Sequence, residues 1–251
     1  MNNRQNILIE ELNTNGYISV VEASEKLNVT EMTIRRDFNF LEEQGLIIRV
    51  HGGAAPRSPV PNGIDVMMQK PRPAQRAIAK ETVKTLSAGQ TVMLNVGTTV
   101  LQIAKEIASS RIPLTVVTNS MLCAIALYKS QSQVLLLGGS IRKESLDLLG
   151  PITENNLDAY HVDVLISGCD GANSTDGFFS SDINLSALEQ KAVKIADKVI
   201  IVTESHKFSK KSFSKFATIQ DVSLLISDEK LSNIDKTNLQ NNNTEILIAK
   251  G

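Results

Sequence analysis

The chain has 251 residues, which is enough for one large or two ordinary domains. Its formal net charge of −1 and sequence pI near 6.3 give it no general attraction to polyanions. Only 4% of the residues are aromatic and none is Trp, which argues against a base-stacking platform for single-stranded nucleic acid. The apolar share of 42% is that of an ordinary globular protein.

Cysteine usage and the hydropathy pattern exclude further classes of protein. Cys123 and Cys169 lie far apart, without His or Cys neighbours at metal-ligand spacing, so we expect no metal site and no disulfide framework. Both are interpreted as small buried apolar residues. The N-terminus lacks the apolar core of a signal peptide, and no uninterrupted apolar run approaches about 18 residues. We therefore expect a soluble, cytoplasmic protein with no membrane partner.

The beginning of the chain predicts two short helices. The first runs from about Arg4 to Leu12 and turns Ile7, Leu8 and Leu12 inward. The second begins at Ser19, because Ser19-Val20-Val21-Glu22 has the capping-box spacing that satisfies free backbone N–H groups at a helix start. Ala23 and Leu27 follow one turn apart on a face that can pack inward.

A tight turn at Asn28-Val29 leads into a third helix, which Thr30 can cap through its hydroxyl. Apolar residues recur in this helix at the i, i+4, i+7 spacing of an amphipathic helix, so one face packs on the core: Ile34, Phe38 and Leu41. The opposite face stays at the surface, where it can contact DNA. It carries Met32, Arg36 and Asn39, with Thr33 and Arg35 on its flanks.

A β-wing is predicted directly after this helix. Gly45 is a typical helix stop, and the segment Leu46–Val50 is apolar and β-branched, as in a strand. His51-Gly52-Gly53-Ala54 supplies turn residues. About the first 55 residues therefore predict a winged helix-turn-helix.

A recognition helix places mainly its N-terminal residues against base edges, where an arginine can pair with guanine O6 and N7. Either arginine of Arg35-Arg36 could instead hold a phosphate, and the alternative is a plain helical subdomain with a solvated charged face. Residues 1–57 hold eight acidic and six Lys or Arg residues, so we expect two modules to act together on DNA. The expected DNA contacts are Thr30, Met32, Thr33, Arg35, Arg36, Asn39, Arg49 and His51.

A Pro-rich linker separates this module from the rest of the chain. Five of the seven prolines fall between Pro56 and Pro73, and such composition favours extended, fairly stiff backbone. We therefore expect a DNA-binding domain over residues 1–57, a linker over 58–74 and an α/β domain over 75–251.

From Gln75 onward, helices alternate with apolar strands, which indicates a mostly parallel sheet. The expected strands are Gln90–Val96, Leu114–Val117, Val134–Leu137, Val162–Ser167, Val199–Val202, Leu224–Ile226 and Glu245–Ile248. The expected helices lie at about Ile78–Leu86, Val100–Ala108, Met121–Tyr128 and Ser186–Ala196. The Asn-rich segment Asn238–Asn243 is typical of a surface turn.

Gly97-Thr98-Thr99 lies where a strand leads into a helix, so free backbone N–H groups and the helix dipole can cradle a phosphate there. Such a turn can also serve only to connect strand and helix. Other strands, however, end in small polar loops at the same edge, where open α/β sheets bind ligands: Thr118-Asn119-Ser120, Gly138-Gly139 and Gly168-Cys169-Asp170-Gly171. Asn119, Asp170 and the hydroxyls could bind the polyol part of a sugar phosphate, and Lys207 could supply a cation. The chain has no GxxxxGK[ST] pattern and no GxGxxG after a strand, so ATP and dinucleotides are less favoured.

An isomerase-like enzyme with an appended helical domain is the alternative. Asp170, Asp182, Glu204 and Lys207 are titratable groups near the expected pocket, and carboxylates with a lysine could isomerise a sugar by proton transfer. No nucleophile with an adjacent base is visible, and nothing ties two of the three histidines together.

Six motifs occur in order over nearly the whole chain: Thr33-Ile34-Arg35-Arg36-Asp37-Phe38, Arg49-Val50-His51-Gly52-Gly53-Ala54, Gly97-Thr98-Thr99, Val117-Thr118-Asn119-Ser120, Leu137-Gly138-Gly139 and Ser205-His206-Lys207-Phe208. Together they resemble the DeoR family of bacterial transcriptional regulators of sugar metabolism. The chain departs from the family pattern near the expected pocket, at Asn95, Leu185-Ser186, Glu204 and His206.

The resemblance implies a repressor of a carbohydrate operon, relieved by a phosphorylated sugar or polyol. Its second domain would be similar to ribose-5-phosphate isomerase but act as a sensor in a dimer or tetramer, with no cofactor and no metal. The expected effector contacts are Gly97, Thr98, Thr99, Asn119, Ser120, Gly138, Gly139, Asp170 and Lys207. Besides the enzyme, a DNA-binding protein whose second domain only oligomerises is a further alternative, which ligand binding would exclude.

Overall fold

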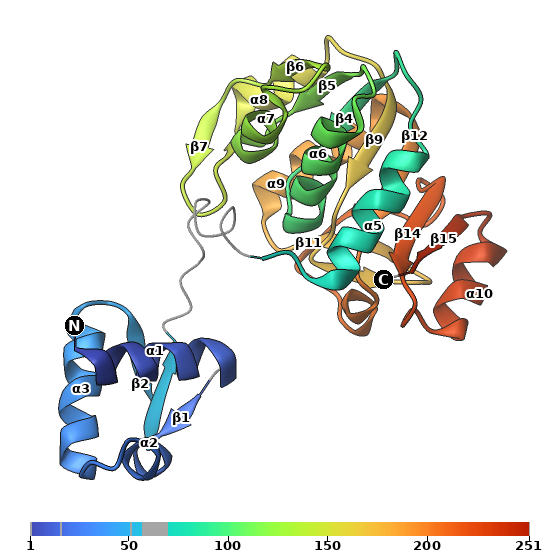
Figure 1. Cartoon of the computed structure of the whole chain (residues 1–251). Helices are drawn as coiled ribbons and strands as arrows, with labels where there is room; N and C mark the ends of the chain where they lie inside the picture. The colour runs from blue at the N-terminus through green and yellow to red at the C-terminus, as the bar shows by residue number, and fades with distance from the viewer. Residues whose placement is uncertain (1, 16, 51, 57–69, 251) are drawn as a thin grey trace. The chain divides into compact units, whose positions relative to one another are not determined.

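A computed structural model of the chain describes residues 2–15, 17–50, 52–56 and 70–250. The chain divides into two compact units, Met1–Asn62 and Gly63–Gly251, drawn in blue to cyan and in teal to red (Figure 1). Among the described residues, none of the helices has the length and apolar character needed to cross a membrane.

The first unit is a winged helix-turn-helix. Its elements in chain order are α1 (Asn3–Asn15), β1 (Ile18–Ser19), α2 (Val20–Leu27), α3 (Glu31–Glu43), β2 (Ile47–Val50) and β3 (Gly53–Pro56). The three strands form an antiparallel sheet in the order β1-β3-β2. The three helices and this sheet enclose one apolar core, which includes Leu8, Leu12, Ile34, Phe38 and Leu41.

The predicted helix ends of the first unit are confirmed. Ser19 and Glu22 make both bonds of the capping box: Glu22 N–H donates to Ser19 Oγ at 3.1 Å, and Ser19 N–H donates to Glu22 Oε2 at 3.0 Å. Thr30 Oγ1 accepts from Thr33 N–H at 3.3 Å, and Gly45 adopts the left-handed conformation (φ 72°) just beyond α3.

Two smaller expectations for this unit are wrong. Ile7 is only half-buried, and Gln5 takes the inward position because its amide donates to the buried Asp37 carboxylate at 3.0 Å. Arg4 Nε also reaches Asp37, at 2.5 Å, which fixes α1 against α3. Gly53 and Ala54 belong to a strand rather than to the turn, because they pair with both β1 and β2.

The second unit is built on a seven-stranded sheet in the order β15-β14-β12-β9-β4-β5-β6, in which every neighbouring pair is parallel. The strands are β4 (Thr91–Leu94), β5 (Thr115–Thr118), β6 (Gln133–Leu136), β9 (Val162–Ser167), β12 (Ala196–Val202), β14 (Leu224–Asp228) and β15 (Glu245–Ala249). The parallel α/β sheet predicted from the sequence is therefore confirmed.

Helices cover both faces of this sheet. One apolar core packs under α5 (Pro73–Lys84), α6 (Thr98–Ser110) and α7 (Met121–Leu127). The other lies under α8 (Pro151–Leu157), α9 (Ile183–Lys194) and α10 (Asn233–Asn241). The resulting architecture has three layers (Figure 1).

The helical prediction is wrong at several places: α5 begins at Pro73 rather than near Ile78, and α8 was not predicted. α6 and α9 start earlier than predicted, because Gly97 and Asp182 stand at their N-caps and Asp182 Oδ1 accepts from the N–H groups of Asn184 and Leu185. Most of the predicted turn Asn238–Asn243 is the end of α10. Packing overrides the low helix propensity of asparagine there, since Leu239 is fully buried in the core.

Two small sheets were not predicted. A hairpin pairs β7 (Ser140–Arg142) with β8 (Asp147–Leu149). A second antiparallel sheet joins β10 (Gly171–Asn173), β11 (Gly177–Ser180) and β13 (Ser214–Ala217). Both are formed by segments that follow the carboxyl ends of the main strands β6, β9 and β12, so they frame that edge of the sheet.

Candidate functional site

The exposed face of α3 carries the side chains expected to meet DNA. Met32 is 62% exposed, and Arg35, Arg36 and Asn39 are also exposed, whereas Thr33 is half-buried. The buried face of the same helix holds α3 on the core. The polar and apolar faces therefore lie where the helical period put them.

Most polar groups on this face already have partners within the protein. Arg35 pairs with Glu31 one turn earlier at 3.4 Å, and Thr30 is occupied as the helix cap. Arg49, on β2, donates a hydrogen bond to Asn39 Oδ1 and so ties the wing to the recognition helix. Among the described residues, the Arg36 guanidinium forms no ion pair. His51 lies outside the described residues.

The carboxyl edge of the large sheet has its topological switch point between β4 and β9. The chain runs from β4 to β5 on one side, while β9 continues the sheet on the other. Asn95, just past β4, donates to Ser167 Oγ at the end of β9 at 3.0 Å, and its Oδ1 atom is buried without a hydrogen-bond partner. Open α/β sheets bind ligands at such a point.

Helix α6 begins beside this switch point. Gly97 has φ 133° at the N-cap, a conformation that favours glycine, and nothing lies within 4 Å of where a Cβ would stand. Gly97 and Thr98 are exposed, whereas Thr99 is nearly buried. Thr98 Oγ1 accepts a hydrogen bond from Gln75 Nε2 on α5 at 2.9 Å. The N-terminus of α6 is thus open to an anion.

The loops after β9 and β12 meet next to α6. A Cβ on Gly168 would lie 3.8 Å from Val96 O and 3.9 Å from Val202 O, between the ends of β4 and β12. Cys169 Sγ donates to Thr203 Oγ1 at 3.3 Å. Burial raises the pKa of Cys169 to about 12, although Thr203 and Lys207 act in the opposite direction. Lys207 lies in the short 3-10 helix Ser205–Ser209 that follows β12.

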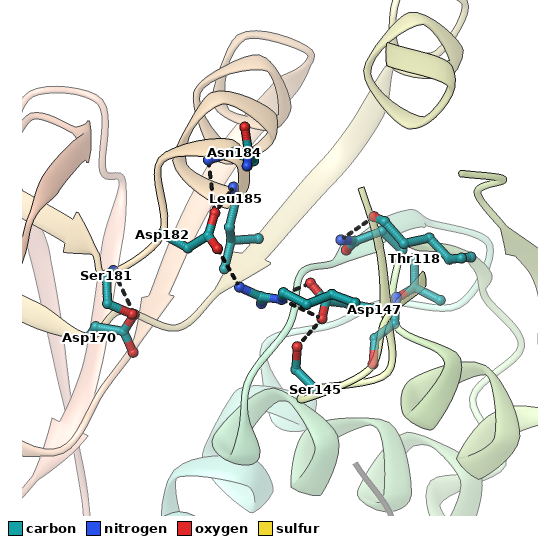
Figure 2. A network of polar contacts seen from close by, with 12 residues as sticks. Thr118, Ser145, Asp147, Asp170, Ser181, Asp182, Asn184 and Leu185 are labelled. Carbon is teal, nitrogen blue, oxygen red and sulfur yellow. Dashed lines mark hydrogen bonds and ion pairs between the residues drawn. The ribbon is translucent and has the colours of Figure 1, made fainter. Parts of the chain in front are cut away.

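Asp170 follows Cys169 in the same loop, and a network of charged groups lies beyond it. Its Oδ2 atom accepts from Ser181 N–H at 2.8 Å and from Ser181 Oγ at 2.6 Å (Figure 2). Asp147 and Asp182, from the hairpin and the start of α9, both bind the guanidinium of Arg142, at 2.9 and 3.1 Å (Figure 2). The backbone N–H of Leu185, together with Arg142, holds the pKa of Asp182 below its ordinary value.

Glu189, on α9, is a buried carboxyl on which the charges of this network act. It is 3% exposed, and its Oε2 atom has no hydrogen-bond partner, like the hydroxyl of the neighbouring Ser180. Burial, with the negative charge of Asp170, raises the pKa of Glu189 to about 8. Glu189 is therefore mostly protonated at neutral pH.

The remaining expected effector residues lie after β5 and β6 and have local structural partners. Asn119 is fully buried and donates to Leu148 O at 3.2 Å, while Ser120 caps α7. Gly138 is exposed. A Cβ on Gly139 would stand 2.0 Å from Thr153 Oγ1, so only glycine fits.

The structure thus brings one subset of the expected residues together around the ends of β4, β9 and β12, namely Gly97, Thr98, Thr99, Asp170 and Lys207. The others surround the neighbouring strand ends. Sequence reasoning missed Arg72, Gln75, Arg142 and Glu189, because no local motif marks them. Among the described residues, no group of three or more His, Cys, Asp or Glu side chains could hold a metal ion.

Comparison with known families decides the identity of both units. Residues 4–59 match the DeoR-like helix-turn-helix domain, and residues 72–229 match the DeoR C terminal sensor domain. The chain belongs to the DeoR family. It is a DNA-binding transcriptional regulator and not an enzyme, as the resemblance implied.

Relatives of this DeoR-family chain are similar over most of their length. It is 34% identical to the uncharacterized HTH-type transcriptional regulator YulB of Bacillus subtilis, over 91% of this chain and 89% of that protein. It is 28% identical to a putative aga operon transcriptional repressor of Escherichia coli O157:H7, over 98% and 93%. Among solved structures, ribose 5 phosphate isomerase A from Neisseria gonorrhoeae is similar in fold, with TM-score 0.41 and 14% identity over 59% of this chain and 54% of that one.

Proposed function

We propose that this regulator represses an operon for carbohydrate uptake or catabolism and that a phosphorylated sugar or polyol relieves the repression. The observation that carries the sensing part is the start of α6, where Gly97 and Thr98 are exposed at the switch point of the sheet. A phosphate there would receive backbone N–H bonds and the favourable end of the helix dipole.

The other half of the effector would meet the polar side chains beyond β9. Lys207 supplies positive charge, while Asp170 has acceptor capacity for hydroxyl groups. Asn119, Ser120, Gly138 and Gly139 would shape the same carboxyl edge of the large sheet. A relative named for the aga operon supports a carbohydrate operon as the target.

On the DNA side, α3 would enter the major groove, with the wing beside it, and Thr30, Arg36 and Asn39 close to the duplex. The first unit has no excess of basic residues, which favours a homo-oligomer that places two modules on one operator. The regulator would work in the cytoplasm, where its operator is accessible.

A thermal-shift screen of the full-length protein against phosphorylated sugars and polyols tests this proposal, because a ligand that binds only the native state raises its melting temperature. We expect at least one phosphorylated compound to raise Tm, and its unphosphorylated parent to leave Tm unchanged. A response to the parent sugar alone, or to none of the compounds, would contradict the phosphorylated effector.

Thr98 gives the matched pair of variants for this site. Thr98→Val keeps the shape but removes the hydroxyl, so we expect intact DNA binding with weakened ligand binding, whereas Thr98→Ser retains the hydroxyl and should bind as the wild type does. Equal ligand titrations for the two variants would remove the Thr98 hydroxyl from the site.

A further inference from the structure

Two side chains at the entrance to the second unit contact the expected effector site directly. Arg72 is the N-cap residue of α5, and Gln75 lies in the first turn of that helix. Arg72 lies in the last part of the expected linker (58–74), immediately before α5. Both residues reach across to groups that follow strands of the large sheet.

The contacts form a continuous chain of hydrogen bonds. Arg72 Nη2 lies 2.6 Å from Glu204 Oε1, just past β12. The backbone N–H of Arg72 donates to Gln75 Oε1 at 3.0 Å, and Gln75 Nε2 donates to Thr98 Oγ1 at 2.9 Å. Arg72 is thereby tied to Glu204 through its guanidinium and, through its backbone N–H and Gln75, to the start of α6, which the proposed function assigns to the phosphate.

The ion pair between Arg72 and Glu204 is easy to exchange. The Arg72 side chain is 57% exposed, so its guanidinium has solvent beside it into which it can turn. The Glu204 side chain is only 10% exposed, so its carboxylate stays in place while the arginine can turn away. Arginine also matches phosphate geometry through two parallel N–H donors.

A bound phosphomonoester would compete with Glu204 for this arginine. It carries about −1.5 to −2 charges at pH 7, against one for the carboxylate. Lys207 lies on the same segment, where its backbone N–H donates to the backbone O of Glu204 at 3.0 Å. The structure therefore brings Arg72, Glu204 and the segment that carries Lys207 together, and the Glu204 carboxylate occupies the Arg72 guanidinium.

We propose, resting on the proposed function, that Arg72 is a ligand of the effector's phosphate. On binding, its guanidinium exchanges Glu204 for the phosphate. Because Arg72 immediately precedes α5, this exchange changes how the end of the linker is held. The exchange therefore transmits ligand binding toward the DNA-binding module.

Ligand binding to full-length variants tests the first part. The probes are inorganic phosphate and a panel of phosphorylated sugars, each titrated alone by calorimetry at constant ionic strength. We expect Arg72→Ala to weaken binding about tenfold, the effect of one charge-assisted hydrogen bond, and Arg72→Lys to weaken it less. Glu204→Gln should tighten binding severalfold, because the competing carboxylate is gone.

Arg76→Ala is the matched control. Arg76 lies on the same helix, is exposed, and donates to Pro71 O at 3.0 Å; in the part of the chain that the structure describes, it contacts neither Glu204 nor Thr98 through a hydrogen bond. Its loss should leave binding within about twofold of the wild type. If the wild type binds a probe and Arg72→Ala binds it equally well, the inference is overturned and the proposed function stands. No wild-type binding to any probe would overturn both.

DNA binding without any ligand tests the transmission step. The probe is a duplex that the full-length protein selects from a random pool. Glu204→Gln removes the charge from the contact that the phosphate would break and so weakens it, and we expect it to lower affinity for this duplex severalfold, whereas Lys80→Ala, an exposed position on the same helix, leaves it unchanged. Wild-type affinity in Glu204→Gln would show that the linker does not respond to this contact and would overturn that step.

Discussion

The arginines of the first unit differ in their hydrogen-bond and ion-pair partners within the protein. Arg35 has Glu31 as a partner, and Arg49 is tied to Asn39. Arg36 is exposed and receives no ion pair among the described residues. An arginine without an internal partner can reach a base edge without first breaking a contact, which favours Arg36 as the residue that reads sequence.

We expect Arg36→Ala to lower operator affinity by about 1–3 kcal/mol, the value of a bidentate contact to guanine. Fluorescence anisotropy with a selected duplex, at fixed salt, measures this loss. Lys230→Ala, an equal change of charge in the other unit, is the control and should bind normally. If Arg36→Ala instead weakened binding to random duplex as much as binding to the selected duplex, Arg36 would be a phosphate contact.

Glu189 makes the stability of the second unit depend on pH. Its pKa is raised from 4.5 to about 8, so the folded state holds a proton that the unfolded state releases. This contribution is complete below about pH 4.5 and is lost as the pH rises toward 8, by at most about 1.4 kcal/mol per pH unit. The carboxylates with lowered pKa, Asp176, Asp182 and Asp228, titrate below this window.

Glu189→Gln keeps the shape of the protonated side chain, so we expect a variant whose stability is flat between pH 5 and 8. Urea unfolding followed by circular dichroism at several pH values measures the slope. The exposed Glu229→Gln should retain the wild-type slope. A wild type with no fall in stability over this window would contradict a protonated Glu189.

At the scale of elements, local patterns predicted what local contacts determine. The sequence predicted the capping box of Ser19, the cap at Thr30 and the parallel strands, because the residues that signal each of them lie within a few positions of one another. The contact of Arg142 with Asp182 spans 40 positions, and that of Arg72 with Glu204 spans 132. No spacing rule reports such pairs, so these parts of the candidate site required the fold.

In the wing, β1 and β3 lie so close together that one position on β3 accepts only glycine. A Cβ at Gly53 would stand 2.3 Å from Ile18 O on β1, whereas at Gly52 only Tyr17 Oη lies within 4 Å, at 3.9 Å. We expect Gly53→Ala to destabilise the first unit by at least about 2 kcal/mol and Gly52→Ala (φ 77°) by about 1 kcal/mol.

Hydrogen exchange of the amides that pair β1 with β3 measures both variants. Exchange should accelerate strongly in Gly53→Ala and slightly in Gly52→Ala. Equal protection in the two variants would mean that the strands can separate without cost, contrary to the close contact at Ile18 O.

For the whole molecule, the division into two units fixes where regulation must act. Each unit has its own apolar core, and the surfaces that would bind DNA and effector belong to different units. An effector can change DNA affinity only if it binds the two states of the protein unequally, and such coupling typically amounts to about 1–3 kcal/mol. We therefore expect the connection between the units to carry the effect.

This requirement makes the isolated first unit the decisive comparison. We expect the effector to weaken operator binding of the full-length protein by a factor of about 5–150 and to leave a fragment of residues 1–62 unaffected, because the fragment keeps its core and α3 but lacks the sensor. Anisotropy titrations of both proteins against the same duplex measure this difference. A fragment that released DNA as the full-length protein does would mean that the effector acts on the DNA-binding unit itself, and regulation through the linker would be wrong.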